Sequence, residues 1–525
     1  MTTIWQYVFG NKQSRRRVMK RFLKRHQGRI TGTLSGFDRV LFRGTLRSIA
    51  HVNGLKVFLY SQHVLFKDFG AYAERLSQRI VEQAKQTASE LGRPYQYLPS
   101  ARESKEELAR QIRERDHIKA GLICVFACVE PCQSFDLQRD RGSKHLQLRS
   151  KERKCLHLYF YYQDREFGLM HVRLQTWLPF TIQVCLNGRE WLARQMDRAG
   201  ITYTQRDNCF TCISDLKRAQ QLMDRLSERK WGKFLDALAR QVNPWVHPRT
   251  GLEVRSYYWS MRQCEYATDV MFGSAGKLAE IYPRLLRHAM FQFSSEEVMR
   301  FLQRRTNRRF AGEASSDLQR RLEGIRVKHR VEENSIKMYD KQGSVLRIET
   351  TINNPRRFRV HRRSLNRGRE VLKWLPMRKG IADIRRRVEL SRAANARYLD
   401  ALAVVGVETP SYCLLDRVNH AVQKFRRRYR ALRPISPDDA SLFQAILHGH
   451  HALQGFRNRD LRKTLAAAGP KNTSARISRL LALLRAHKLI YKVCKTNYYR
   501  ITRKGHQVMA TALKFRQPEI ALLAT

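Results

Sequence analysis

The sequence predicts a mixed α/β body of α+β type, with two β-rich units and helical insertions, followed by a smaller C-terminal domain. Three observations support this fold class. Apolar runs of strand length are interspersed with amphipathic helical stretches over residues 31–214. A second group of alternating segments begins at Gly324. Finally, residues 433–437 contain two prolines in the composition typical of a domain boundary.

The chain is therefore expected to contain six parts. These are a basic N-terminal arm (1–30), a mixed α/β domain (31–214), a helical basic region (215–323), a β-hairpin unit that completes the core (324–360), an arginine-rich helical connector (361–435) and the C-terminal domain (436–525).

Hydrophobic periodicity places the elements of the body. In the α/β domain we expect a strand at 36–44, helices at 71–91 and 105–114, a doubly buried strand at 121–129, a hairpin of 156–162 with 167–177, and a helix at 191–200. The helical region has basic faces at 222–238, 297–304 and 318–322. In the hairpin unit, strands are expected at 325–330, 335–339 and 345–353, with a turn at 340–343.

Positive charge is the most informative feature of the composition. The 525 residues include 101 Lys and Arg against 46 Asp and Glu, a formal net charge of +55. Such a chain repels itself unless a polyanion neutralises it, and nucleic acid is the common polyanionic partner. A hydrophobic content of 42% argues against a disordered chain. We therefore expect a nucleic-acid-binding protein, with DNA favoured and structured RNA as the other candidate.

Several other classes are disfavoured. No run of 18 apolar residues indicates a membrane span, and no secretory leader is recognisable at the start. The ten cysteines are spread along a large chain, which fits reduced thiols and a cytoplasmic, nucleoid-associated location. Zinc is not favoured, because only Cys209 and Cys212 have the spacing of a ligand pair. No glycine-rich nucleotide motif is present, so no nucleotide cofactor is expected.

Residues 437–510 have the pattern of a winged-helix domain. Helices are predicted at 441–453, 458–467 and 475–487, followed by strands at 488–493 and 498–502 and a last helix. The segments 483–490 and 499–505 resemble the ending of bacterial MarR- and ArsR-type regulators, with Lys488 where that family often has glycine. The resemblance implies a third helix that enters the major groove of DNA and a hairpin that contacts the backbone.

The candidate nucleic-acid contacts fall into two groups. The resemblance implies groove contacts from Thr473, Ser474, Arg476 and Arg479, and phosphate contacts from Lys492, Lys495 and Arg500. The connector adds two arginine runs, Arg385, Arg386, Arg387 and Arg426, Arg427, Arg428. The nearby His448, His450 and His451 are expected to be surface or packed residues rather than metal ligands.

The β-hairpin unit carries the residues best suited to chemistry. Its segment 334–341 leads through a turn into 345–353, and the pattern is similar to a Y-x-K … L-R-h-E hairpin in replication initiators from rolling-circle plasmids and filamentous phages. That resemblance implies a nicking-and-joining enzyme, in which a tyrosine attacks a DNA phosphate and a carboxylate holds a divalent metal.

In this interpretation Tyr339 is the nucleophile, and Glu349 could bind Mg²⁺ or Mn²⁺. A phenol needs nearby cations or metal to favour the phenolate, and Lys337, Lys341 and Arg347 supply positive charge on or beside the hairpin. The alternative is an exposed hairpin in which Arg347 and Glu349 form a cross-strand ion pair and Tyr339 is simply packed.

A second set of acids lies in the first β-rich unit. Asp38 is on a strand, Glu130 follows a buried strand and Asp164 is in a hairpin turn. Carboxylates at strand ends of one domain could clamp the attacking and leaving oxygens in a two-metal nuclease. They could equally be surface acids that balance local arginines. The spacing of Tyr, Asp, Gly, Arg and Thr in 162–176 also echoes that in 339–350, which is compatible with a two-lobed core.

The sequence thus favours a bacterial, mobile-element type of protein that binds DNA and carries out metal-dependent nicking or strand transfer. Two alternatives of other classes stay open. One is a non-catalytic DNA-binding regulator or scaffold, and the other is an RNA-binding component of a large ribonucleoprotein.

Overall fold

The computed structural model of the protein describes residues 20–140, 142, 145–247, 256–303, 314–321, 324–366, 369–405, 411–424, 427–447, 455–466, 473–493 and 496–516. Most of the predicted basic arm lies outside these residues, as do Arg426, Lys495 and the histidines at 448, 450 and 451. The chain divides into two compact units. The first comprises Met1–Tyr282, Asp317–Lys328 and Glu333–Ala401, and the second Pro283–Ser316, His329–Glu332 and Leu402–Thr525.

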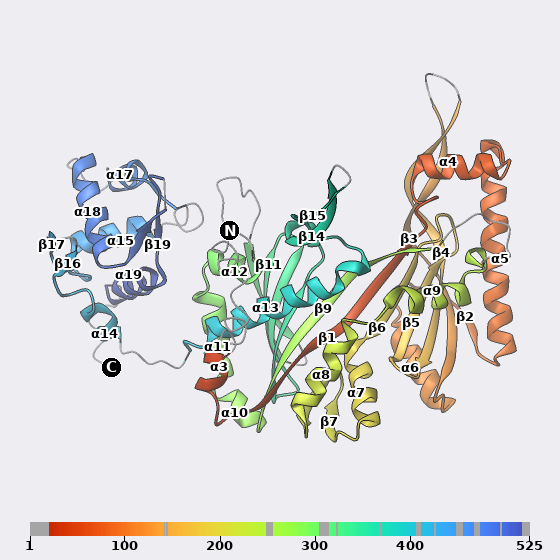
Figure 1. Ribbon diagram of the computed structural model, residues 1–525, viewed down its shortest axis with the longest axis horizontal. Coiled ribbons are helices and arrows are strands. Elements are labelled where there is room, and N and C mark those ends of the chain that lie inside the picture. Colours follow the sequence, from red (N-terminus) through yellow and green to blue (C-terminus); the bar gives the residue numbers. More distant parts are fainter. Residues whose placement is uncertain are drawn as a thin grey trace. The chain divides into compact units, whose positions relative to one another are not determined.

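The described residues form an eleven-stranded mixed sheet with the strand order β10-β11-β12-β13-β9-β1-β6-β5-β4-β3-β2 (Figure 1). The strands are β1 (Ile30–Thr45), β2 (Tyr95–Leu98), β3 (Gly121–Arg139), β4 (Leu146–Asp164), β5 (Gly168–Gln175), β6 (Ile182–Asn187), β9 (Tyr258–Phe272), β10 (Ala314–Arg321), β11 (Gly324–Val331), β12 (Asn334–Lys341) and β13 (Val345–Thr351). This confirms the mixed α/β prediction for the body.

The sheet consists of two halves with a similar order of elements. The long strands β1 and β9 pair with each other in antiparallel fashion. After β1 the chain forms helices, then a meander of β3 to β6 that returns to pair with β1. After β9 it again forms helices, then a meander of β10 to β13 that returns to β9. The neighbours of the central pair are therefore β6 on one side and β13 on the other.

Helices cover both faces of the first half. They are α4 (Val52–Ser61), α5 (Phe69–Glu90), α6 (Lys105–Arg115), α7 (Gly188–Arg198), α8 (Leu216–Leu226) and α9 (Trp231–Val242). On β3 and β4, Val125 and Phe160 share a core with α5, whereas Phe126 and Tyr161 share another with α6. Because successive strand residues point to opposite faces, α5 and α6 lie on opposite faces of the sheet. We call the face that bears Tyr161 the α6 face.

Three predictions of helix are wrong. The expected helical region contains the central strand β9, and β10 replaces the helix expected at 318–322. The second half of β9 is buried almost throughout although it includes Thr268 and Asp269, so its sequence shows no period-2 alternation. The expected helical connector likewise opens with a hairpin, β14 (Arg359–Asn366) and β15 (Arg369–Pro376), before helix α13 (Ile384–Leu402) begins.

The second unit has its own core around its C-terminal helices. Its elements include α11 (Tyr282–Phe291, from Pro283 onward), α12 (Ser295–Phe301), α14 (Ser411–Asp416), β16 (Val422–Lys424), β17 (Arg427–Tyr429), α15 (Pro437–Ile446), α17 (Asn458–Ala466), α18 (Ser474–Ala486), β18 (Ile490–Lys492), β19 (Tyr499–Ile501) and α19 (Arg503–Phe515). Three helices, a hairpin and a last helix thus follow one another in the order expected from the sequence. In the part of the chain that the structure describes, no helix is both long enough and apolar enough to cross a membrane.

Candidate metal-binding and catalytic site

A β-bulge at the centre of the sheet creates the site. Phe37 of β1 pairs with Tyr266 of β9, and Val40 pairs with Cys264, so the two residues Asp38 and Arg39 oppose the single residue Glu265. A bulge of this kind re-aims side chains and is common beside active sites. Here both Asp38 and Arg39 line the same pocket as Glu265.

Three carboxylates meet at this bulge. Asp38, Glu265 and Glu349 each place an oxygen so that all three atoms lie within 4.8 Å of one another. Asp38 and Glu349 are only 4% and 2% exposed. Clustered carboxylate oxygens are the ligands that Mg²⁺ and Mn²⁺ prefer, so the donor set fits a hard divalent cation. We call these three residues the acid triad.

A buried ion-pair network holds the triad in place. Arg347 is fully buried, and its Nη1 donates to Asp38 Oδ2 at 2.8 Å. Its Nε and Nη2 donate to the two carboxylate oxygens of Asp269 at 2.6 and 2.9 Å. Arg189, also fully buried, lies 3.0 Å from Asp269. Arg347 lies opposite Tyr339 in the pairing of their two strands, and its charge opposes the rise that burial causes in the pKa of Tyr339, as expected from the sequence. Because the Arg347 side chain is enclosed by its own partners, it also positions Asp38.

Tyr339 and Lys337 both contact Glu349. The Tyr339 hydroxyl donates to Glu349 Oε2 at 2.9 Å, and the Lys337 ammonium donates to Oε1 at 2.6 Å. Lys337 also lies 3.7 Å from Glu265. The alternative of an exposed hairpin with an Arg347–Glu349 ion pair is thus wrong, because both residues are buried and Glu349 pairs with Lys337 instead.

The pKa values of the acid triad and of Tyr339 are shifted because the carboxylates are buried close together. Burial, with a contribution from Glu349, raises the pKa of both Asp38 and Glu265 above their usual values, although Arg347 and Lys337 oppose the effect. Although burial favours the neutral acid, Lys337 and Arg347 hold the pKa of Glu349 below its usual value. Burial and the neighbouring Glu349 raise the pKa of Tyr339 well above its usual value. An added cation would relieve this repulsion.

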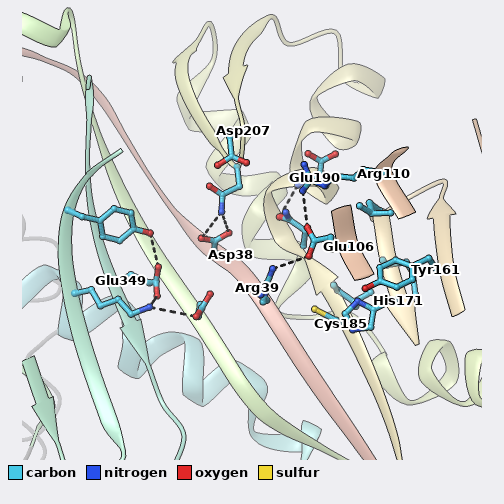
Figure 2. A pocket seen from close by; sticks show the side chains of 18 of the residues that line it. Asp38, Arg39, Glu106, Arg110, Tyr161, His171, Cys185, Glu190, Asp207 and Glu349 are labelled. Carbon is cyan, nitrogen blue, oxygen red and sulfur yellow. Dashed lines mark hydrogen bonds and ion pairs between the residues drawn. The ribbon is translucent and has the colours of Figure 1, made fainter. Parts of the chain in front are cut away.

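The triad opens into a pocket of about 520 Å³ (Figure 2). Seven of its described lining residues are acidic and five are Lys or Arg, in a protein whose net charge is +55. Around the triad itself, the four carboxylates of Asp38, Glu265, Asp269 and Glu349 face three cations, Arg189, Lys337 and Arg347. A concentration of negative charge in so basic a chain favours a bound cation at this position.

Two of the predicted metal ligands lie elsewhere. Glu130 accepts from the Tyr159 hydroxyl at 2.7 Å and from Arg173 at 2.6 Å. Asp164 accepts from the backbone N–H groups of Glu166 and Phe167, and so stabilises the β4–β5 turn. Neither joins the acid triad, because Glu130 is held by donors from β4, β5 and α6 and Asp164 by backbone donors of its own turn. Lys341, expected near the nucleophile, is 2.6 Å from Asp207.

Glu265 is the triad member that sequence analysis missed. It lies in β9, a segment predicted to be helical, in which the alternation of Tyr258–Met261 is interrupted at Arg262 and Gln263 just before Glu265. The bulge that brings it opposite Asp38 depends on pairing between residues more than 200 positions apart.

The predicted nucleic-acid contacts fall into different environments. Arg476, Arg479, Lys492, Arg427 and Arg428 are exposed. Thr473 caps α18 and Ser474 bonds Asn458, while Arg500 lies 3.7 Å from Glu296. On α13, Arg385 and Arg386 pair with Glu389 and Asp383. Arg387 is only 1% exposed and donates to the Ile352 carbonyl, so its predicted contact with nucleic acid is wrong.

Comparison of the chain with models of protein families, with curated proteins and with solved structures gave no match.

Proposed function

We propose that the protein is a metal-dependent enzyme that nicks or transfers DNA strands through a covalent tyrosine intermediate. The observation that carries this proposal is the hydrogen bond between the Tyr339 hydroxyl and Glu349, a member of an acid triad suited to Mg²⁺ or Mn²⁺. A nucleophile, a proton acceptor and a candidate metal site thus lie within one pocket.

The chemistry follows from these contacts. As the Tyr339 oxygen attacks a DNA phosphorus atom, the phenol proton passes to the Glu349 carboxylate, which already accepts a hydrogen bond from the Tyr339 hydroxyl. A phosphotyrosine bond forms and one phosphate–sugar bond breaks, which leaves a strand with a free hydroxyl. The Lys337 ammonium, 2.6 Å from Glu349, can supply the proton that the leaving oxygen requires. The reverse reaction rejoins a strand.

Asp38, Glu265 and Glu349 would hold the cation. A divalent ion at this position supplies positive charge that lowers the pKa of the attacking phenol and stabilises charge on the phosphate. The buried pair of Arg347 with Asp38 fixes the direction of the Asp38 carboxylate. The regulator and ribonucleoprotein alternatives offer no reason for a tyrosine and three acids to share one pocket.

Chelation of divalent ions is expected to abolish cleavage. The full chain is incubated with a pool of random single-stranded oligodeoxynucleotides, labelled at either end, in Mg²⁺, in Mn²⁺ or in EDTA. We expect shortened strands and a denaturation-resistant protein–DNA adduct with either metal and neither product in EDTA. The labelled end that stays with the protein identifies which side of the break it holds. Equal cleavage in EDTA would contradict the proposal.

We also propose that the C-terminal elements form a winged-helix domain that recognises duplex DNA. The support is the order α15, α17, α18 and the β18–β19 hairpin, together with two exposed arginines, Arg476 and Arg479, on α18. In such domains the third helix contacts base edges in the major groove.

Arg476→Ala and Arg479→Ala are each expected to weaken binding to a selected duplex by about 1–3 kcal/mol, with much smaller effects on other duplexes. Selection from a random duplex pool supplies the target, and fluorescence anisotropy measures binding. Arg485→Ala is the matched control, because nine residues place Arg485 half a turn away from Arg476. An equal loss on every duplex would instead identify phosphate contacts.

A further inference from the structure

Three arginines gather around one amide on neighbouring strands. Arg43 of β1 and Arg173 of β5 both pair across the sheet with Gln183 of β6. With the Gln183 amide oxygen turned toward the guanidinium groups, it accepts from Arg262 Nη1 at 2.7 Å and from Arg173 Nη1 at 3.2 Å. We call Arg43, Arg173 and Arg262 the arginine cluster.

Positive charge in this cluster exceeds the negative charge beside it. Arg173 pairs with Glu130 at 2.6 Å, and the same carboxylate lies 3.2 Å from Lys105. Arg173 and Lys105 thus share one carboxylate, and among the described residues neither Arg43 nor Arg262 forms an ion pair. Burial and the charges of Arg262 and Arg173 lower the pKa of Arg43. The Nε atoms of Arg43 and Arg173 are buried and have no hydrogen-bond partner among the described residues, so neighbouring acceptors satisfy these two guanidinium groups only in part.

The cluster lies on the same face of the sheet as the acid triad. Along the β1–β6 pairing, Arg39 opposes Asn187, and Arg43 opposes Gln183 four residues later. Because side chains alternate along a strand, Arg43 points to the same face as Arg39, which lines the pocket. The five steps along the strand from Asp38 to Arg43 span about 16 Å. A few nucleotides of an extended strand can cover that distance.

We propose that the arginine cluster is a binding site for a phosphodiester group of single-stranded DNA, a few nucleotides away from the strand position that reacts at Tyr339. Guanidinium groups donate in planar forks that match phosphate oxygens, and three of them can surround one phosphate. The proposal rests on the proposed function, and it adds the path of the strand along β1. A single strand is the expected ligand, because the triad lies inside a pocket that an intact duplex cannot enter without unpairing.

The test measures binding without cleavage. A labelled single-stranded oligodeoxynucleotide is titrated in EDTA with the full chain and with Arg43→Gln/Arg262→Gln, over a range of salt concentrations. We expect about a tenfold weaker affinity, and a plot of log affinity against log salt that is shallower by about 0.7, as for one lost phosphate contact on a single strand. The matched control Arg75→Gln/Arg79→Gln removes the same charge from exposed positions on α5, which covers the opposite face.

Each outcome has one meaning. Affinity and salt slope equal to those of the control variant would overturn the site, as would a loss confined to an oligoribonucleotide of the same sequence. Arg262→Gln alone changes an exposed side chain, so it keeps the test available if the double variant fails to fold. The proposed function is tested separately by Tyr339→Phe, which should stop cleavage while leaving this binding unchanged. Both proposals would be supported if the arginine variant binds the strand weakly and Tyr339→Phe binds it normally but does not cleave it.

Discussion

Replacing Tyr339 by phenylalanine is expected to reduce strand cleavage on the order of 10³-fold or more and to eliminate the covalent protein–DNA adduct. Only the hydroxyl oxygen is removed, and that oxygen is the proposed attacking atom. Losses of this size accompany removal of the nucleophile in other enzymes that use covalent catalysis. The measurement is single-turnover cleavage of end-labelled single strands with Mg²⁺, analysed by denaturing electrophoresis.

The variant should remain folded and bind DNA normally. It loses one hydrogen bond to Glu349, which is worth about 1–1.5 kcal/mol when the remaining partner keeps another donor. Glu349 keeps Lys337 at 2.6 Å. Tyr97→Phe is the matched control, since Tyr97 is 54% exposed on β2. Unchanged cleavage in Tyr339→Phe would mean that water is the nucleophile and that Tyr339 only orients Glu349.

The hairpin that bears Tyr339 could be predicted from the sequence because its information is local. Apolar and polar residues alternate through 335–339 and 345–353, and the turn at 340–343 contains a glycine with positive φ, Gly343. The strand register then follows, and it pairs Lys337 with Glu349 and Tyr339 with Arg347. Side chains two residues apart on a strand share one face, so these four lie on the same face of the hairpin. The same alternation allowed Tyr339 and Glu349 to be singled out together from the sequence.

The partners of the hairpin could not be predicted, because they depend on distant pairing. Asp38 and Glu265 meet only through the bulge between β1 and β9, and no local pattern marks an extra residue in a strand. Glu130 and Asp164 looked equally suitable as acids at strand ends. Glu130 and Asp164 differ from Asp38 in the side chains and backbone groups that surround them in the folded protein. The spacing of residues along the chain does not reveal these neighbours.

Buried charge misled the sequence analysis in the same way at two arginines. Arg387 belongs to an arginine run that predicts contact with nucleic acid, and Arg347 is expected from the sequence either beside the nucleophile or on an exposed hairpin, yet each is at most 1% exposed. Arginine is almost never fully buried unless it is paired, so exposure is the better expectation from sequence alone. Arg347 is enclosed with its carboxylate partners Asp38 and Asp269, whereas Arg387 donates to the backbone carbonyl of Ile352.

Replacing Arg347 by methionine is expected to destabilise the first unit by about 3–5 kcal/mol, because it leaves the buried Asp38 without its paired cation and Asp269 with Arg189 alone. All five N–H groups of Arg347 are used. They contact Asp269 twice, Asp38 once, and the side-chain and backbone oxygens of Asn208. Urea unfolding followed by tryptophan fluorescence measures the change, since every tryptophan of the chain belongs to the first unit.

A double-mutant cycle distinguishes the cost of uncompensated charge from the cost of lost packing. Methionine fills part of the space, so the cost should come from the charge of Asp38, which loses its cation, and from that of Asp269, which keeps only Arg189, rather than from a cavity. Adding Asp38→Asn to Arg347→Met removes one of these charges, and the double variant should be more stable than Arg347→Met alone. Arg79→Met, at an exposed position on α5, should change stability by less than about 0.5 kcal/mol. A double variant less stable than Arg347→Met would mean that Asp38 is held by Asn208, whose amide donates to both Asp38 oxygens, and not by the arginine.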